Sequence, residues 1–154
     1  MKRLIPVIVL AAGCAVVPQP DAPGGPDPRV EPVPRLPAEA AEARSLEEYK
    51  QQVAHAILHA NAEHTFIGRL PEVLKSVVVL QVEIDRLGFP YAVRLFRSNG
   101  YKDLEARAIQ SVRAGSLPKP GGAVTGGHGY VSFTETWLFR DDGKFQIRTL
   151  AGPQ

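Results

Sequence analysis

Between Ser45 and Asn61 the chain reads SLEEYKQQVAHAILHAN, in which apolar residues recur three or four positions apart. That spacing places them on one side of an α-helix. Ser45 with Glu48 three residues later is typical of a capping box, which satisfies free backbone amides at the start of a helix. The segment therefore predicts an amphipathic helix, with an apolar stripe formed by Leu46, Tyr49, Val53, Ile57 and Ala60.

A regular alternation of side chains follows in SVVVLQVEID, and its β-branched content suits a half-buried strand. RLGF then supplies Gly88 for a turn, and PYAVRLFRS returns with Val93 and Leu95 on one face. These segments predict a hairpin. The two faces of its first strand carry Val78, Leu80, Val82 and Ile84 on one side and Val77, Val79, Gln81 and Glu83 on the other.

A second helix is predicted in KDLEARAIQSVRAG, which follows the break NGY. Asp103 and Glu105 lie near its start, Gly115 is able to end it, and the prolines of LPKP forbid its continuation. Its apolar face consists of Leu104, Ala108, Ile109 and Val112.

The last third of the chain predicts two more strands. The glycine-rich residues 121–129, GGAVTGGHG, are expected to form a mobile loop, and YVSFTETWLFR alternates as a strand. DDG is a strong turn signal, after which KFQIRTL returns. The order helix, strand, strand, helix, strand, strand predicts a small α+β domain of two layers, with an antiparallel sheet packed on two helices.

The hairpin VVVLQVEIDRLGFPYAVRLFRSNG, the helix DLEARAIQSVRAG and the exit SLPKP together resemble the C-terminal domain of TonB and TolA proteins. The leading helix around YKQQVAHAIL is similar to the TolA variety. The resemblance covers residues 45–150, although Leu87 stands where the usual turn has an acidic residue and the final strands are longer than usual. Family positions are filled by Asp85, Gly88, Ser98, Gly100, Leu104, Ala108, Pro118 and Pro120.

The resemblance implies a periplasmic, non-enzymatic module that binds envelope proteins, often by adding a partner segment to an open sheet edge. Such an edge would also permit a homodimer. Energy transducers of this family carry an inner-membrane helix of about 20 apolar residues, which is not evident in this sequence. A lipid-anchored binding protein is therefore preferred. A TonB-type transducer for outer-membrane transport, with an uncleaved N-terminal anchor, is the alternative.

The N-terminus, MKRLIPVIVLAAGC, has the charged, apolar and small-residue regions of a secretory signal. It resembles a bacterial lipoprotein signal, in which residues 1–13 are removed and Cys14, the only cysteine, becomes the acylated first residue. One departure is Leu10, which lies four residues before Cys14 where the pattern prefers three. The alternatives are an ordinary signal and an uncleaved anchor. Ala15 after the cysteine resembles release to the periplasmic side of the outer membrane, with inner-membrane anchoring as the alternative.

Residues 14–44 differ sharply in composition from the remainder of the chain. They contain eight prolines between Pro18 and Pro37 and show no apolar periodicity. Because proline favours extended polyproline II, this composition predicts a disordered tether. The folded domain is expected over residues 45–150.

Charge and composition argue against several classes of function. The net charge of +2 comes from scattered Lys and Arg, and no basic stripe interleaved with aromatic residues predicts a nucleic-acid partner. His55, His59 and His64 have metal-ligand spacing, but no Glu completes an HExxH motif, so solvated histidines are expected and a metal-dependent enzyme is the weakest alternative. Glu83 and Asp85 are expected to face solvent. No catalytic site, metal or cofactor is therefore predicted.

Aromatic residues gather on the third strand. Phe133, Trp137 and Phe139 share one face with Val131. They are expected to form core, and an exposed aromatic patch for a partner is the alternative.

Overall fold

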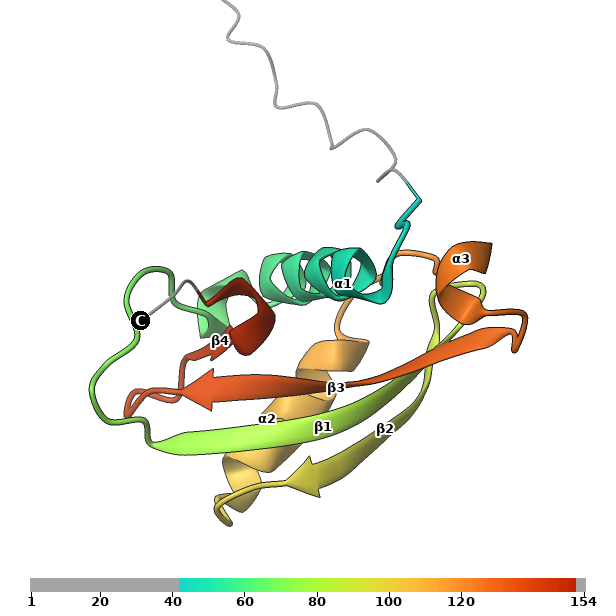
Figure 1. Cartoon of the computed structure of the whole chain (residues 1–154). Helices are drawn as coiled ribbons and strands as arrows, with labels where there is room; N and C mark the ends of the chain where they lie inside the picture. The colour runs from blue at the N-terminus through green and yellow to red at the C-terminus, as the bar shows by residue number, and fades with distance from the viewer. Residues whose placement is uncertain (1–41, 152–154) are drawn as a thin grey trace, which may run out of the picture. The chain divides into compact units, whose positions relative to one another are not determined.

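The computed structural model describes residues 42–151, and Cys14 and most of the expected tether lie outside this range. The described chain forms a small α+β domain with one four-stranded antiparallel sheet in the order β2-β1-β3-β4 (Figure 1). The predicted fold class is thus confirmed. The elements are α1 (Leu46–Ala60), the 3₁₀ turn η1 (Ala62–His64), β1 (Ser76–Asp85), β2 (Pro90–Arg97), α2 (Lys102–Arg113), α3 (Gly122–Thr125), β3 (Tyr130–Phe139), β4 (Phe145–Ile147) and the 3₁₀ turn η2 (Arg148–Leu150).

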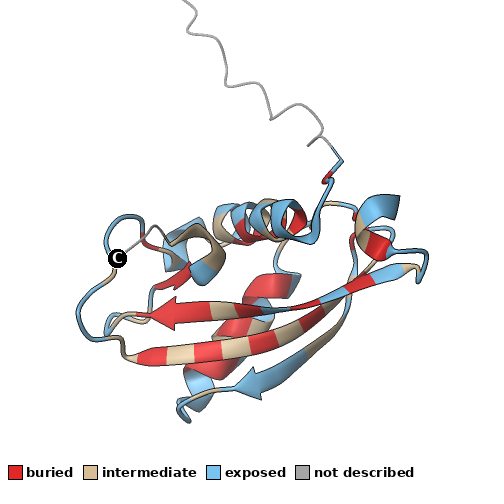
Figure 2. Ribbon diagram, in the orientation of Figure 1, coloured by how far each residue is buried: buried red, intermediate tan, exposed pale blue. Residues whose placement is uncertain are grey.

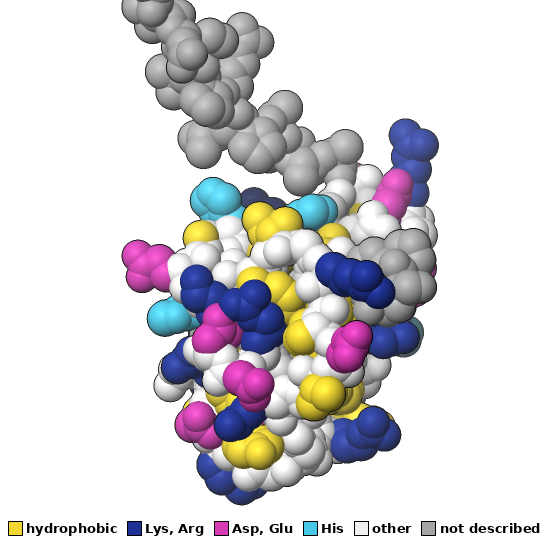
Figure 3. Space-filling view, turned by 90° about the vertical axis from the view of Figure 1, so that its left-hand side faces the viewer, with side chains coloured by type: hydrophobic (Ala, Val, Ile, Leu, Met, Phe, Trp, Pro, Cys, Tyr) yellow, Lys and Arg dark blue, Asp and Glu magenta, His cyan; other side chains and the backbone are white. Residues whose placement is uncertain are grey.

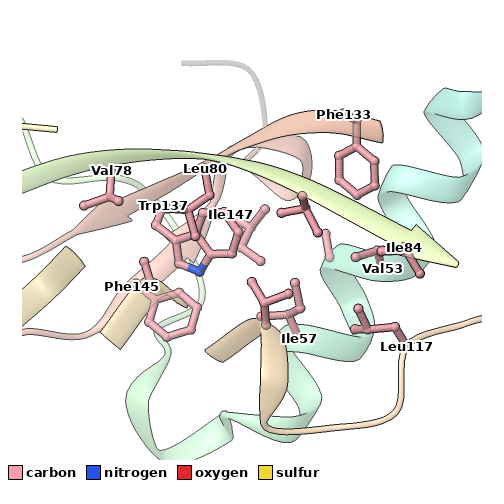
Figure 4. Close-up of a cluster of buried hydrophobic side chains, with 14 of the residues drawn as sticks. Val53, Ile57, Val78, Leu80, Ile84, Leu117, Phe133, Trp137, Phe145 and Ile147 are labelled. Atoms are coloured by element: carbon pink, nitrogen blue, oxygen red, sulfur yellow. The ribbon is translucent and has the colours of Figure 1, made fainter. Parts of the chain in front are cut away.

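Helices α1 and α2 pack on the same face of the sheet, because their buried side chains join those of one face of β1 and β3 in a single cluster (Figure 4). Strand β1 alternates between buried and half-buried residues along its whole length (Figure 2). This is the pattern of a strand whose second face is left largely to solvent. The largest fully buried side chains of the cluster are Trp137, Tyr49, Phe139 and Phe145.

The start of α1 confirms the expected cap. The Ser45 hydroxyl accepts a hydrogen bond from the Glu48 amide at 3.2 Å, while the Glu48 carboxylate accepts from the amide of Arg44 at 2.7 Å. The predicted apolar stripe is correct only in its middle. Leu46 is 40% exposed and Ala60 is also exposed, because they occupy the two ends of the helix.

Helix α2 buries Leu104, Ala108 and Val112 as predicted, with Ile109 partly buried against the cluster. It also contributes Ser111, whose hydroxyl accepts a hydrogen bond from the Trp137 indole at 2.9 Å. The same hydroxyl donates to the Ala108 carbonyl at 2.8 Å. The polar end of the buried tryptophan is therefore satisfied within the core.

Two local predictions are wrong. The glycine-rich residues 121–129, expected as a loop throughout, contain the short helix α3, whose Thr125 is buried. The returning segment KFQIRTL is a strand only over Phe145–Ile147, after which the chain turns into η2. Local backbone hydrogen bonds form both turns: the Thr125 amide donates to the Gly121 carbonyl, and the Ala151 amide donates to the Ile147 carbonyl, each at 3.1 Å.

Candidate partner-binding edge

Strand β2 forms one border of the sheet, at the bottom of the view in Figure 1. Among residues 42–151 its only strand partner is β1. The opposite border, β4, is flanked by the segment after η1: Thr65 forms a parallel bridge with Phe145, and the Phe66 amide donates to the Phe145 carbonyl at 3.2 Å. The guanidinium of Arg140 then lies 4.6 Å from the centre of the Phe66 ring. Within the described chain, β2 thus has no strand or bridge beyond it along its whole length, whereas β4 covers only Trp137–Phe139 of β3 on the other side of the sheet.

The pairing of β2 with β1 is irregular at two points. The register shifts between Val79 and Leu80 and again between Glu83 and Ile84, which leaves Phe96 and Tyr91 as extra residues on β2. Such bulges twist an edge and limit uncontrolled pairing with other chains. Between the two irregularities the pairing is regular, from Leu80 opposite Leu95 to Glu83 opposite Ala92.

Residues 94–97 of β2 are all exposed, and Val93 is only partly buried against the core (Figure 2). The sequence places Leu95 on one face of the strand with Val93, and Leu95 is 42% exposed. It does lie opposite Leu80, which is fully buried. Leu95 therefore lies on the same face as the core but without the cover that Leu80 has.

Glu83 and Arg94 form an ion pair on the solvent face, with 2.6 Å between carboxylate and guanidinium. The Tyr91 hydroxyl, and after it Arg94, lower the pKa of the Glu83 carboxyl below its ordinary value, against the opposing effect of desolvation. Glu83 therefore remains ionised and orders two side chains of β2. The Glu83 carboxylate thus holds neighbouring side chains in place and does not form a carboxylate pair with Asp85.

Asp85 shapes the β1–β2 turn. Its carboxylate accepts hydrogen bonds from the amides of Leu87 at 2.8 Å and Phe89 at 2.9 Å. Gly88 has a φ of +86°, and a Cβ built there would lie 2.5 Å from the Leu117 carbonyl oxygen. The turn thus requires glycine for both its conformation and its contact.

The other end of β2 is fixed by a polar cluster. Ser98 donates to Glu105, and the Lys102 ammonium lies 2.9 Å from the same carboxylate. The Ser98 hydroxyl, followed by Lys102, lowers the pKa of Glu105. Asn99 donates to the Lys75 carbonyl at 3.1 Å. Side-chain hydrogen bonds therefore fix the chain at both ends of β2.

The remaining candidates from the sequence do not converge on this edge. Cys14 lies outside the described residues. His55, His59 and His64 are exposed, and residues 42–151 contain no group of three or more His, Cys, Asp or Glu side chains that could hold a metal ion.

Phe133, Trp137 and Phe139 belong to the core, so the alternative of an exposed patch at these residues is wrong. The exposed aromatic residues instead lie at and around β2: Phe89, Tyr91, Phe96, Tyr101 and Tyr130. For Tyr91 and Phe96 the sequence does carry a signal, the arginines interleaved in PYAVRLFRS, a pattern that suits a strand with little cover.

Acidic and basic side chains alternate with small apolar areas on the face in Figure 3, without a block of one sign. No helix within residues 42–151 is both long and apolar enough to cross a bilayer. No family model, curated protein or solved structure matches this chain.

Proposed function

We propose that this chain is a non-enzymatic lipoprotein of the cell envelope whose domain binds a partner protein by strand addition to β2. The observation that supports the proposal is the open β2 edge, in a domain whose other border is flanked by Thr65 and Phe66. Backbone amides and carbonyls of such an edge supply affinity, and the side chains beside it supply selectivity. The resemblance to TonB and TolA C-terminal domains agrees with this use of an edge.

Acylated Cys14 would hold the protein on the periplasmic side of the outer membrane. The proline-rich residues between Cys14 and the domain would set its reach toward envelope partners. A TonB-type transducer for outer-membrane transport is the second role, and it would require an uncleaved N-terminal anchor that reaches a proton motor.

Site-specific photo-crosslinking in cells tests the binding role. A photoreactive residue at Leu95 should trap an envelope protein, because Leu95 is on the open edge and 42% exposed. The matched control is His59, which is exposed on α1, away from the sheet edge. Equal trapping at both positions, or none at Leu95, would contradict edge binding. Recovery of proton-motor subunits together with an intact Met1 would instead favour transduction.

A further inference from the structure

The tip of the β1–β2 hairpin presents two large apolar side chains to solvent. Leu87 is 65% exposed and Phe89 is 66% exposed. Isolated exposed apolar residues are common, but a neighbouring pair at the end of a hairpin forms a projecting apolar surface. This surface is separate from the regular middle of the β2 edge.

The tip is rigid. The Asp85 carboxylate holds the amides of Leu87 and Phe89, the Asp85 amide donates to the Phe89 carbonyl at 2.9 Å, and the Gly88 amide donates to the Asp85 carbonyl at 3.1 Å. Gly88 also rests directly against the Leu117 carbonyl. Because the backbone of the tip is already ordered, transfer of the two side chains from water into an apolar environment would cost little conformational entropy.

Two tyrosines lie behind the tip. The rings of Tyr91 and Tyr130 meet edge to face, with centroids 5.8 Å apart and an interplanar angle of 88°. Both side chains are substantially exposed. An aromatic ring with a polar hydroxyl is the side chain that proteins place at the boundary between hydrocarbon and lipid headgroups.

Two cations accompany the apolar residues. Arg86 precedes Leu87 in the turn and is exposed, and Arg113 lines a cleft of about 350 Å³ together with Leu87, Phe89, Ser116 and Leu117. Neither arginine has an ion-pair partner among residues 42–151. The nearest carboxylate in the sequence, Asp85, is occupied by backbone amides. The apolar tip thus carries positive charge beside it.

The first described residue lies beside α3. Glu42, the first described residue, accepts a hydrogen bond from the Gly122 amide at the start of α3 at 3.2 Å. In Figure 1 α3 and the β1–β2 turn lie at one end of the sheet. The 27 residues between Cys14 and Glu42 can span at most about 100 Å. An anchor at Cys14 would therefore keep this end within reach of the bilayer.

We infer that the β1–β2 tip docks on the surface of a bilayer that contains anionic phospholipid. Leu87 and Phe89 enter the boundary of the acyl chains, Tyr91 and Tyr130 lie at headgroup level, and Arg86 and Arg113 contact lipid phosphates. The inference rests on the proposed lipid anchor, which brings the domain to a membrane. Docking by the tip leaves the β2 edge from Val93 onward available to a partner protein.

Tryptophan fluorescence with vesicles tests the inference. The full chain carrying Cys14→Ser, which cannot be acylated, is given either Phe89→Trp or Ile67→Trp. Ile67 is 96% exposed in the loop before β1 and serves as the matched control. The native Trp137 is fully buried and common to both proteins. Vesicles contain phosphatidylcholine with brominated acyl chains, with or without phosphatidylglycerol.

With phosphatidylglycerol present, the emission of the Phe89→Trp protein should shift to the blue and be quenched by bromine, while that of the Ile67→Trp protein should not. In the Phe89→Trp background, Arg86→Ala or Arg113→Ala should each weaken the vesicle affinity about fivefold. Quenching no greater in the Phe89→Trp protein than in the control, or quenching independent of phosphatidylglycerol, would overturn the inference. Because the vesicles contain no protein partner, this result is independent of whether the β2 edge binds one.

Discussion

The indole Nε1–H of Trp137 donates a hydrogen bond to the Ser111 hydroxyl, 2.9 Å away, and both residues are buried. This bond joins β3 to α2 across the middle of the core. It allows the largest aromatic residue of the domain to be buried without an unsatisfied polar atom.

Replacing Ser111 by alanine should lower the free energy of unfolding by about 1–3 kcal/mol, because the Trp137 N–H would lose its buried acceptor. Urea denaturation followed by circular dichroism measures the change. Ser116→Ala, at an exposed position, is the control and should have little effect. Equal stability of the two variants would show that the hydrogen bond contributes nothing.

Gly88→Ala should destabilise the domain more than Gly100→Ala. Both glycines have positive φ, +86° and +95°, so both substitutions incur backbone strain of about 1–2 kcal/mol. Only at Gly88 would the new Cβ meet a backbone atom, the Leu117 oxygen at 2.5 Å, while Gly100 has nothing within 4 Å. The difference between the urea midpoints of the Gly88→Ala and Gly100→Ala proteins therefore measures the cost of the clash with Leu117. A larger loss at Gly100 would mean that the turn does not pack on Leu117 as described.

Sequence periodicity is sufficient for the elements that bury one face. Alternation alone groups Val78, Leu80, Val82 and Ile84 on one side of a strand, and all four are buried. Periodicity depends on which side of a segment is buried, and a half-buried strand gives a clear alternation because only one of its faces contacts the core.

Strand order cannot be obtained in the same way. That β2 is an outer strand, and that Thr65 and Phe66 flank β4, depends on contacts between residues far apart in the chain. The extra residues Tyr91 and Phe96 likewise appear only in the register of β2 against β1. The sequence therefore predicts that the sheet has an open edge, but it does not predict which residues form that edge.

Protonation of Glu105 should contribute to the loss of stability of the domain at acidic pH. Its pKa is lowered in the folded state by the Ser98 hydroxyl and then by Lys102, so the ionised form favours folding. The stabilisation is present above the unfolded pKa, near the ordinary value of 4.5, and is lost as the pH falls through the lower folded value. Urea midpoints between neutral pH and pH values well below 4.5 should fall less steeply for Glu105→Gln than for the unmodified protein. Glu47→Gln, at an exposed position of α1, should retain the full pH dependence.

Cys14 should be the acylated first residue of the mature protein. Mass spectrometry of the membrane fraction should give a chain that lacks residues 1–13 and carries the mass of attached lipid. Cys14→Ser should retain the signal residues or release the protein from the membrane. An intact Met1, or a free thiol at Cys14 in the unmodified protein, would exclude the lipoprotein route.

Leu95→Lys should abolish partner capture without unfolding the domain. A charged residue on the core-facing side of an edge strand opposes the addition of another strand, because pairing would bury the charge. Leu95 is 42% exposed, so the lysine ammonium can reach water in the free protein. Leu46→Lys is the matched control, since Leu46 is 40% exposed on α1. With a photoreactive residue at Phe96, the crosslinked partner should be lost in Leu95→Lys and retained in Leu46→Lys, while the two urea midpoints stay close. Persistent crosslinking in Leu95→Lys would mean that the partner binds beside Phe96 without pairing with β2.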